Sequence, residues 1–384
     1  MQPKIIDILR CPIDSKELEL VVFVQEEIIS STNFNRIKHG LLLNKRLNII
    51  YPIFNYTPVM VCFETNLHKL FSKQFENNLK DYQSFHYANL QPEKGEKFIQ
   101  NSFSEEWNLT ETEDDELSFQ RTDQDLIDFN KYVWLRWLKN NKVSSLLNVG
   151  CGAGKETIAL QKVTNANDVI AIDFNFSILK AAENYKNNDS INFVLSSLFH
   201  IPIESETFDL VYSQGVIHHT YSTAEAFKSI AKFVKKNGFL FVWVYALEDH
   251  FVNRNESFTS LRKFLKHTLK KVDLTIERIL RPIIGHSTPF LRNIFIKIIA
   301  AVLHPIMLKR VIHPDKWKFK NTEHSVRDAY SPIYAWEHSI NEVVEWYENA
   351  DFTIIDFQSP KNYKEIFNGK VLHGIGLTGR KNQE

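Results

Sequence analysis

Apolar and polar residues alternate along residues 141–246 in a way that predicts strands and helices in turn. Short apolar runs bounded by turn residues predict five strands, at 145–149, 168–172, 191–195, 208–213 and 238–245. Apolar residues at helical spacing between them predict helices at about 155–163, 176–186 and 222–236. Because strands that alternate with helices build parallel, doubly wound sheets, this part of the chain is predicted to be an α/β domain.

Two segments precede this core. Residues 1–65 carry short apolar runs separated by Pro and Gly, which predict a small module of strands and hairpins. Residues 66–140 are polar and compatible with helix, and we interpret them as a linker with N-terminal helices. Within them, 125–139 has the apolar spacing of one amphipathic helix, which we expect to pack just before the first strand of the sheet.

Two segments follow the fifth predicted strand. Residues 247–335 contain two apolar runs at helical spacing, with Lys and Arg in much of the remainder, so we predict a basic helical cap inserted into the core. Residues 336–384 contain a predicted helix and two predicted strands, at 339–349, 352–358 and 372–380. The core is thus predicted to comprise 141–246 together with 336–384.

Composition limits the class of protein. The 384 residues are 43% hydrophobic and 13% aromatic, which supports a large core and argues against global disorder. Lys plus Arg and Asp plus Glu both total 46, so the net charge gives no reason to expect nucleic-acid binding. Three cysteines imply no disulfide framework and suit a reducing, cytoplasmic compartment. Asp7 and Arg10 break the first apolar run, so we expect no signal peptide, and no apolar run of transmembrane length predicts a membrane-spanning helix.

Charge is distributed unevenly along the chain. Residues 104–128 carry ten acidic residues against Arg121 alone, and we expect such a run to be a solvated face or loop. Residues 254–320 carry fifteen Lys or Arg against four Asp or Glu. The structural interpretation of this basic segment, which we favour, is a helical subdomain with a solvated face. The functional interpretation is contact with an anionic acceptor or with a membrane surface, which would make the protein peripheral to the membrane.

Residues 146–156, LLNVGCGAGKE, carry the strongest chemical signal. An apolar strand end is followed by three alternate glycines and then by a helical pattern, which brings bare backbone and a helix N-terminus towards a ligand. The dinucleotide pattern G-x-G-x-x-G fails because its third glycine would be Lys155. The phosphate loop fails because it would need glycine at Val149 and Ser or Thr at Glu156.

Two further patterns lie at the ends of predicted strands. Asp173 follows the second strand, where a carboxylate can accept hydrogen bonds from ribose hydroxyls; an incidental surface Asp is the alternative. The fourth predicted strand and the residues after it read FDLVYSQGVIHHT, at 208–220. Together with G-x-G-x-G, these segments resemble the class I S-adenosylmethionine-dependent methyltransferases, in particular the ubiquinone/menaquinone-methylase-like group. The final helix, strand and strand also resemble the ending of that fold.

The resemblance implies a Rossmann-like sheet of seven strands with an antiparallel last strand, and the cofactor S-adenosyl-L-methionine. It implies methyl transfer to a small-molecule, glycan or lipid-linked acceptor. The cofactor-binding residues that it implies are Asn148, Gly150, Cys151, Gly152, Gly154, Asp173, Phe174, Ser197, Leu198, Ser213 and Gln214.

Several positions leave alternatives open. Asn148 and Ser197 stand where the family commonly has aspartate, which motivates the alternative of a catalytically inactive scaffold. His219 could act as a general base, although a structural histidine is the more common case. Phe103 to Trp107 resembles an F-x-x-x-W element that can fold over the cofactor in some relatives; we slightly favour a core tryptophan.

The first module has a resemblance of its own. ILRCP and HGLLLNKRLNIIYPIFNYTPVMV resemble the zinc-ribbon family of methyltransferase activators. Cys11 stands at the first ligand position of that family, but Asp14 stands at the second, and 43–47 contains no cysteine. One cysteine cannot hold structural zinc, so we expect a ribbon that has lost its metal, or else an unrelated β module.

Overall fold

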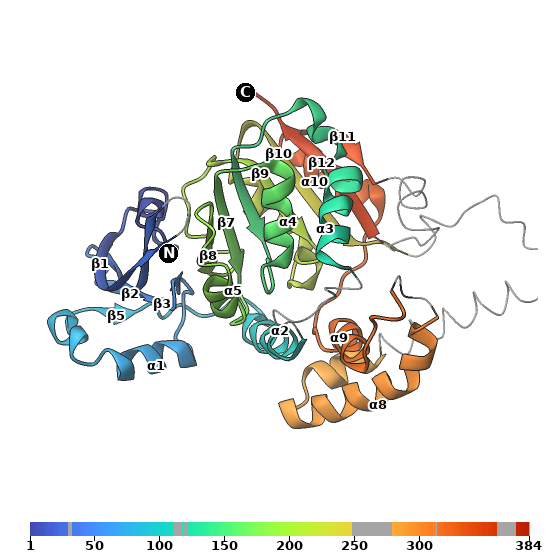
Figure 1. Ribbon diagram of the computed structural model, residues 1–384, viewed down its shortest axis with the longest axis horizontal. Helices are drawn as coiled ribbons and strands as arrows, with labels where there is room; N and C mark the ends of the chain where they lie inside the picture. Colours follow the sequence, from blue (N-terminus) through green and yellow to red (C-terminus); the bar gives the residue numbers. More distant parts are fainter. Residues whose placement is uncertain are drawn as a thin grey trace, which may run out of the picture.

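The computed structural model describes residues 1–29, 33–110, 117, 121–247, 279–309, 311, 313–358 and 374–383. A seven-stranded sheet forms its centre (Figure 1), with the order β8-β7-β6-β9-β10-β12-β11. The strands are β6 (Ser145–Val149), β7 (Asp168–Asp173), β8 (Ile191–Leu195), β9 (Phe208–Gln214), β10 (Val234–Tyr245), β11 (Phe352–Phe357) and β12 (Gly374–Lys381).

The pairing of these strands confirms the predicted fold class. Strands β8, β7, β6, β9 and β10 pair in parallel, whereas β12 is antiparallel to both of its neighbours, β10 and β11. This is a class I methyltransferase sheet with its antiparallel final strand. The strand order reverses at β6, so the loops after β6, β7 and β9 meet at the topological switch point, where such sheets bind ligands.

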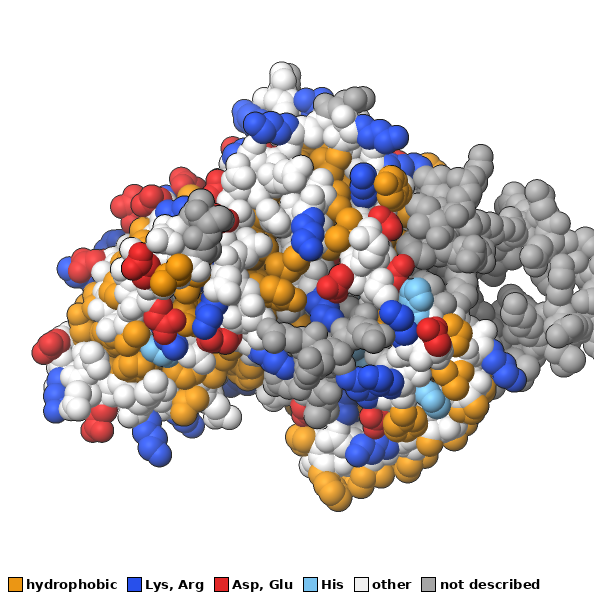
Figure 2. All heavy atoms as spheres, viewed as in Figure 1, with side chains coloured by type: hydrophobic (Ala, Val, Ile, Leu, Met, Phe, Trp, Pro, Cys, Tyr) orange, Lys and Arg blue, Asp and Glu red, His pale blue; other side chains and the backbone are white. Residues whose placement is uncertain are grey.

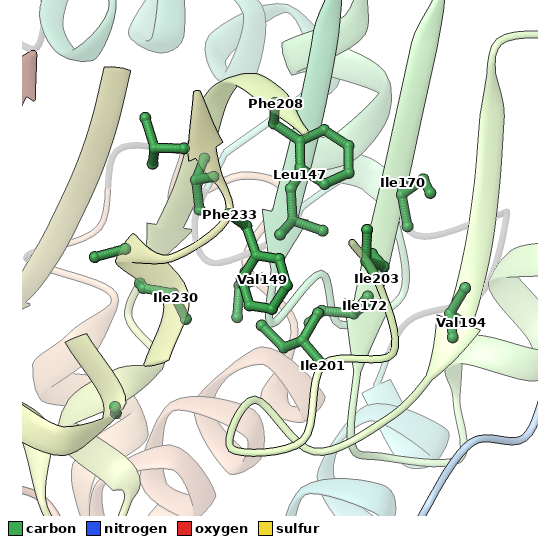
Figure 3. Close-up of a cluster of buried hydrophobic side chains, with 14 of the residues drawn as sticks. Leu147, Val149, Ile170, Ile172, Val194, Ile201, Ile203, Phe208, Ile230 and Phe233 are labelled. Carbon is green, nitrogen blue, oxygen red and sulfur yellow. The ribbon is translucent and has the colours of Figure 1, made fainter. Parts of the chain in front are cut away.

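The alternation of side chains along β6 explains why both faces of the sheet are covered. Leu147 and Val149 face one cluster, which Figure 3 shows with Ile230 and Phe233 from the α6 region. Leu146 faces the opposite cluster. The helices that cover the core of the sheet are α4 (Lys155–Thr164), α5 (Ile178–Asn184), α6 (Thr223–Ala231) and α10 (Ile340–Asn349). Continuous burial along the strand, with successive side chains in opposite clusters, is the pattern expected of a sheet between two helical layers.

The N-terminal module is a separate, smaller sheet. Its strands are β1 (Glu19–Ile28), β2 (Phe34–Asn44), β3 (Ile49–Phe54), β4 (Thr57–Pro58) and β5 (His86–Tyr87), and helix α1 (Asn66–Gln74) follows β4. The module covers the β8 edge of the large sheet, because the Met60 N–H donates to the Leu195 carbonyl at 2.8 Å. The buried Arg36 guanidinium also donates to the Ile191 carbonyl at 2.9 Å. An edge strand that would otherwise expose unpaired backbone is thereby protected.

Two sequence predictions about helices need correction. The helix predicted at 222–236 ends at Ala231, because Val234 already pairs with Phe208 as the first residue of β10. The single helix predicted at 125–139 is divided into α3 (Asp123–Phe129), a π-helical turn and a 3₁₀ turn. Most of the first apolar run of the cap, in 248–278, lies outside the described residues.

Three further helices lie near the carboxyl ends of the parallel strands (Figure 1). They are α2 (Glu96–Thr110), α8 (Pro289–Met307) and α9 (Phe319–Tyr330). The sequence predicted no membrane-spanning helix, but α8 is long and apolar enough to cross a membrane by length and composition, although Arg292 and Lys297 interrupt its apolar run. One helix of this length and composition is weak evidence for a membrane span. Only 17% of its most apolar window is buried in the protein.

Candidate cofactor site

The loop after β6 is shaped by its glycines. Gly150, Gly152 and Gly154 have φ angles of +81°, +54° and +89°, a region that side chains rarely adopt. A methyl group on Gly150 would lie 2.2 Å from the Val216 side chain, so the loop needs a bare backbone there. Gly154 is the N-cap of α4, which places the helix N-terminus directly after the loop.

Asp173 lies at the end of β7 beside this loop. Its Oδ2 accepts a hydrogen bond from the Gly152 N–H at 2.7 Å, and its Oδ1 accepts one from the Asn175 N–H at 2.9 Å. Burial raises the pKa of the carboxyl, while those hydrogen bonds oppose the shift. The structure therefore brings together the two strongest features of the sequence, a bare glycine backbone and a strand-end carboxylate. The carboxylate can accept hydrogen bonds from a ligand with adjacent hydroxyls, such as the ribose of S-adenosyl-L-methionine.

Helix α2 lies across the same strand ends. The Trp107 ring covers Gly152, since a methyl group on that glycine would lie 2.9 Å from the indole. Ser104 Oγ accepts a hydrogen bond from the Phe176 N–H at 3.0 Å, just beyond the end of β7. The half-buried Trp107 thus supports the interpretation of F-x-x-x-W as an element over the cofactor loop rather than as a core tryptophan.

The first turns of α2 continue this contact. Gln100 Nε2 donates to the Phe174 carbonyl at 3.0 Å, and the Glu96 carboxylate accepts a hydrogen bond from the Ser197 hydroxyl after β8. Residues 96, 100, 104 and 107 share one face of the helix because they are spaced by three or four. Helix α2 therefore packs across the loops after β6, β7 and β8.

The other face of α2 binds the cap. Glu106 is fully buried, and its Oε1 lies 3.0 Å from Nε2 of His324 on α9. Glu105 Oε2 lies 3.0 Å from Arg292 on α8 and 3.5 Å from Arg327 on α9. The prediction that this acidic run is solvated is therefore wrong for Glu105 and Glu106, because basic residues of the cap pair with them. The acidic residues at 111–116 lie outside the described part of the chain.

Asn148 and Ser197, the two departures from the family pattern, are both engaged by the protein itself. Asn148 Nδ2 donates to the Thr157 hydroxyl of α4 at 2.9 Å, so this amide ties β6 to α4. Ser197 Oγ, besides its bond to Glu96, accepts a hydrogen bond from the Phe199 N–H at 3.2 Å. Their roles in cofactor binding stay predictions.

Four other predicted cofactor residues lie at these strand ends with varied exposure. Cys151 packs into the core, and burial raises the pKa of its thiol. Ser213 Oγ is fully buried and donates to the Val149 carbonyl at 3.2 Å. The Gln214 amide nitrogen donates to the Tyr212 hydroxyl at 2.6 Å. The partly buried Leu198 packs against the core, so of these four Cys151 and Ser213 are the least able to touch a ligand.

His219 is held in one orientation. Its Nδ1 lies 2.8 Å from the Tyr334 carbonyl, which fixes the proton on Nδ1. Within the described part of the chain, its Nε2 has no hydrogen-bond partner. Nε2 lies 3.9 Å from Oδ1 of Asp328, and the Tyr245 hydroxyl donates to the other oxygen of Asp328 at 2.9 Å. Burial lowers the pKa of His219, although Asp328 opposes this. A neutral imidazole with an unused Nε2 lone pair can accept a proton.

Asp14 and Cys11, at the two positions that would correspond to zinc ligands, contact other side chains of the N-terminal module. Asp14 accepts hydrogen bonds from Asn44 Nδ2 at 3.1 Å and Arg46 Nε at 3.1 Å. Burial would raise the pKa of Asp14, but these hydrogen bonds lower it to about 2. Cys11 Sγ lies 3.4 Å from the Tyr51 hydroxyl. Among the described residues no group of three or more His, Cys, Asp or Glu could hold a metal ion. The activator-like origin of the module stays a prediction.

Sequence reasoning missed the residues that join separate segments. Glu96, Gln100 and Ser104 repeat at helical spacing ahead of Trp107, and this was a usable signal for a helix with one polar, ligand-facing side. Asp328 and Tyr334 left no such signal, because they approach His219 from a segment more than a hundred residues away.

Comparison with known families adds a name to this geometry. Residues 147–242, from β6 to β10, match the family described as a methyltransferase domain. The chain is 25% identical over 158 residues to a mitochondrial ubiquinone biosynthesis O-methyltransferase of Candida albicans, covering 38% of this chain and 48% of that protein. It is 26% identical over 117 residues to a malonyl-[acyl-carrier protein] O-methyltransferase of Marinomonas, covering 29% of this chain and 43% of that protein. The chain thus spans less than half the length of either relative.

Solved structures show weak similarity. A Burkholderia thailandensis 1,6-didemethyltoxoflavin-N1-methyltransferase with bound S-adenosylhomocysteine aligns at 12% identity and a TM-score of 0.41, covering 77% of this chain and 93% of that chain. One chain from the structure of a Haloferax volcanii methyltransferase activator in complex with a methyltransferase aligns at 13% identity and a TM-score of 0.38, covering 68% of this chain and 93% of that chain. The domain match and the strand order carry the assignment: residues 147–242 form a class I methyltransferase domain, which supports S-adenosyl-L-methionine as the cofactor.

Proposed function

We propose that this protein transfers a methyl group from S-adenosyl-L-methionine to a small-molecule, glycan or lipid-linked acceptor. The observation that carries the proposal is the contact between Asp173 and Gly152 at 2.7 Å, which unites the glycine loop and the strand-end carboxylate in a matched methyltransferase domain. The cofactor supplies an electrophilic methyl group on a sulfonium, so the protein's task is positioning and exclusion of water.

The chain's own residues divide this task. The glycine loop presents bare backbone to the cofactor, and Asp173 accepts hydrogen bonds from its hydroxyls. Trp107, over Gly152, keeps water from the loop. The bound cofactor would supply the methyl group and leave as S-adenosylhomocysteine when its methyl–sulfur bond breaks. For a hydroxyl acceptor, His219 Nε2 would take the proton that the acceptor oxygen loses on methylation. The His219 role suits an acceptor whose proton must leave.

The test combines the purified protein with an extract of cells that lack its gene, in which the acceptor should be unmethylated. With S-adenosyl-L-methionine that carries an isotopically labelled methyl group, we expect a labelled product one methylene heavier than its precursor. His219→Asn should reduce its formation while leaving cofactor binding intact. If no labelled product forms in any extract, methyl transfer to such acceptors is contradicted.

A catalytically inactive scaffold is the second candidate function. It is favoured by the bonding of Asn148 to Thr157 and of Ser197 to Glu96, since both side chains are occupied within the protein. Binding of S-adenosylhomocysteine without any methylated product would support this candidate over the first.

A further inference from the structure

Helix α8 carries a continuous apolar stripe on its outer face. The stripe consists of residues spaced by four, with exposed fractions that decide its character: Phe290 73%, Ile294 40%, Ile298 59%, Val302 66% and Ile306 44%. Residues four apart on a helix lie one above another, so these side chains form one ridge along the helix. Figure 2 shows apolar side chains along the lower edge of the molecule, where Figure 1 places α8. We call this ridge the α8 stripe.

The opposite face of α8 packs against the rest of the protein. Arg292, Ile296 and Ala300 are buried, and Ile296 and Ala300 share an apolar cluster with Val326 and Tyr330 of α9. Arg292 also contacts Glu105 of α2 at 3.0 Å. The helix is therefore held on the protein along one face, while its second apolar face remains exposed. Crossing a membrane would break the buried Arg292 contact, whereas lying on its surface would not.

Charge around the stripe indicates what covers it. Residues 289–307 contain no Asp or Glu. Lys297 on α8, Lys309 just after it and Lys318 at the N-cap of α9 are exposed. Along the sequence, 254–320 has fifteen basic against four acidic residues. Two copies packed through the stripe would bring the exposed lysines together, which is unfavourable, whereas an anionic lipid surface complements them.

We propose that the α8 stripe docks this protein on anionic membranes. The helix lies in the plane of the interface, with the stripe among the acyl chains and the lysines at the headgroups. This docking does not depend on methyl transfer. It places the cap, α2 and the glycine loop in successive layers from the lipid, because α8 packs on α9 and both contact α2.

The test is sedimentation of the full-length protein with vesicles. We expect binding to phosphatidylcholine vesicles that contain about a third phosphatidylglycerol, and weaker binding as salt is raised. The double variant Ile298→Glu/Val302→Glu should lower the partition coefficient about tenfold or more, because it places two carboxylates in the stripe. The matched control is Leu70→Glu on α1, which alters another half-exposed apolar residue and should bind like the unaltered chain.

A second measurement keeps the result independent of folding. On adding the mixed vesicles, amide hydrogen exchange should slow in peptides from 289–307 and stay unchanged in α1. No binding to the mixed vesicles, or equal loss in Leu70→Glu, overturns the proposal. A stable dimer of the unaltered chain that Ile298→Glu/Val302→Glu dissociates overturns it too, since the stripe would then bind a second copy.

Discussion

Oδ2 of Asp173 accepts a hydrogen bond from the backbone N–H of Gly152 at 2.7 Å. This contact joins the end of β7 to the loop after β6, and the Trp107 ring lies against the same glycine. The carboxylate, the loop and α2 therefore form one unit, so that a change in any of them should alter both cofactor binding and local stability.

Gly152→Ala should destabilise the protein by about 1–3 kcal/mol, because the added methyl group would lie 2.9 Å from Trp107 at a φ of +54°. Urea unfolding measures the change. Gly215→Ala is the matched control, since Gly215 has a φ of +72° but its nearest neighbour would lie 3.8 Å away. It should cost only the backbone strain. Equal losses in the two variants would show that Trp107 does not press on the loop.

Glu106→Gln should remove a pH dependence of stability. Burial raises the pKa of Glu106 from 4.5 to about 7, although the hydrogen bond to His324 opposes the shift. A raised carboxyl pKa gives a stabilisation that is fully present below the unfolded pKa and is lost as the pH rises through the folded pKa. As the pH rises from about 4 to about 8, the free energy of unfolding of the unaltered chain should fall by about 3 kcal/mol relative to that of Glu106→Gln.

This pH prediction is checked by the free energy of unfolding, measured for both chains across that window. Glu345→Gln on α10 changes an exposed carboxyl and serves as the control. Should the difference between the unaltered chain and Glu106→Gln be the same at every pH, the buried carboxyl would not be the group that titrates.

Arg36→Ala should destabilise the fold by about 2–4 kcal/mol, because the carbonyls of Lys186, Asn188 and Ile191 would lose their buried donor. Arg46→Ala in the same module is the control; its guanidinium is 48% exposed, and its ion pair with Asp14 should be worth about 1 kcal/mol or less. Denaturant titration gives both values. Similar small losses in the two variants would mean that the N-terminal module does not stabilise the β8 edge through Arg36.

His219→Asn should lower kcat for methyl transfer with little change in the cofactor Kd. Burial lowers the pKa of His219, so the neutral base persists below its ordinary range, and activity should fall only when the pH drops through that lowered pKa. The pH profile of kcat measures this. An unchanged kcat and acid limb in His219→Asn would assign the histidine a structural role alone.

The strands of the sheet could be predicted because local pattern determines them. The predicted span 145–149 is the observed β6, since its apolar residues pack on both faces. The helix predicted to 236 was too long because pairing of Val234 with Phe208, a tertiary contact, starts β10 early. Glu106 was predicted to be solvated because its partner His324 is 218 residues away. The glycine loop and Asp173 could be recognised because their signal is local, whereas the contacts of Asp328 and of the cap could not, because their partners lie far away in the sequence.

The central claim is that Asp173 and the glycine loop bind S-adenosyl-L-methionine. Calorimetric titration with S-adenosylhomocysteine tests it most directly, comparing the unaltered chain with Asp173→Ala. We predict binding by the unaltered chain and a loss of at least about tenfold in Asp173→Ala, because the carboxylate would no longer accept the ribose hydrogen bonds. No binding at millimolar ligand, or equal affinity in the two chains, would contradict the account.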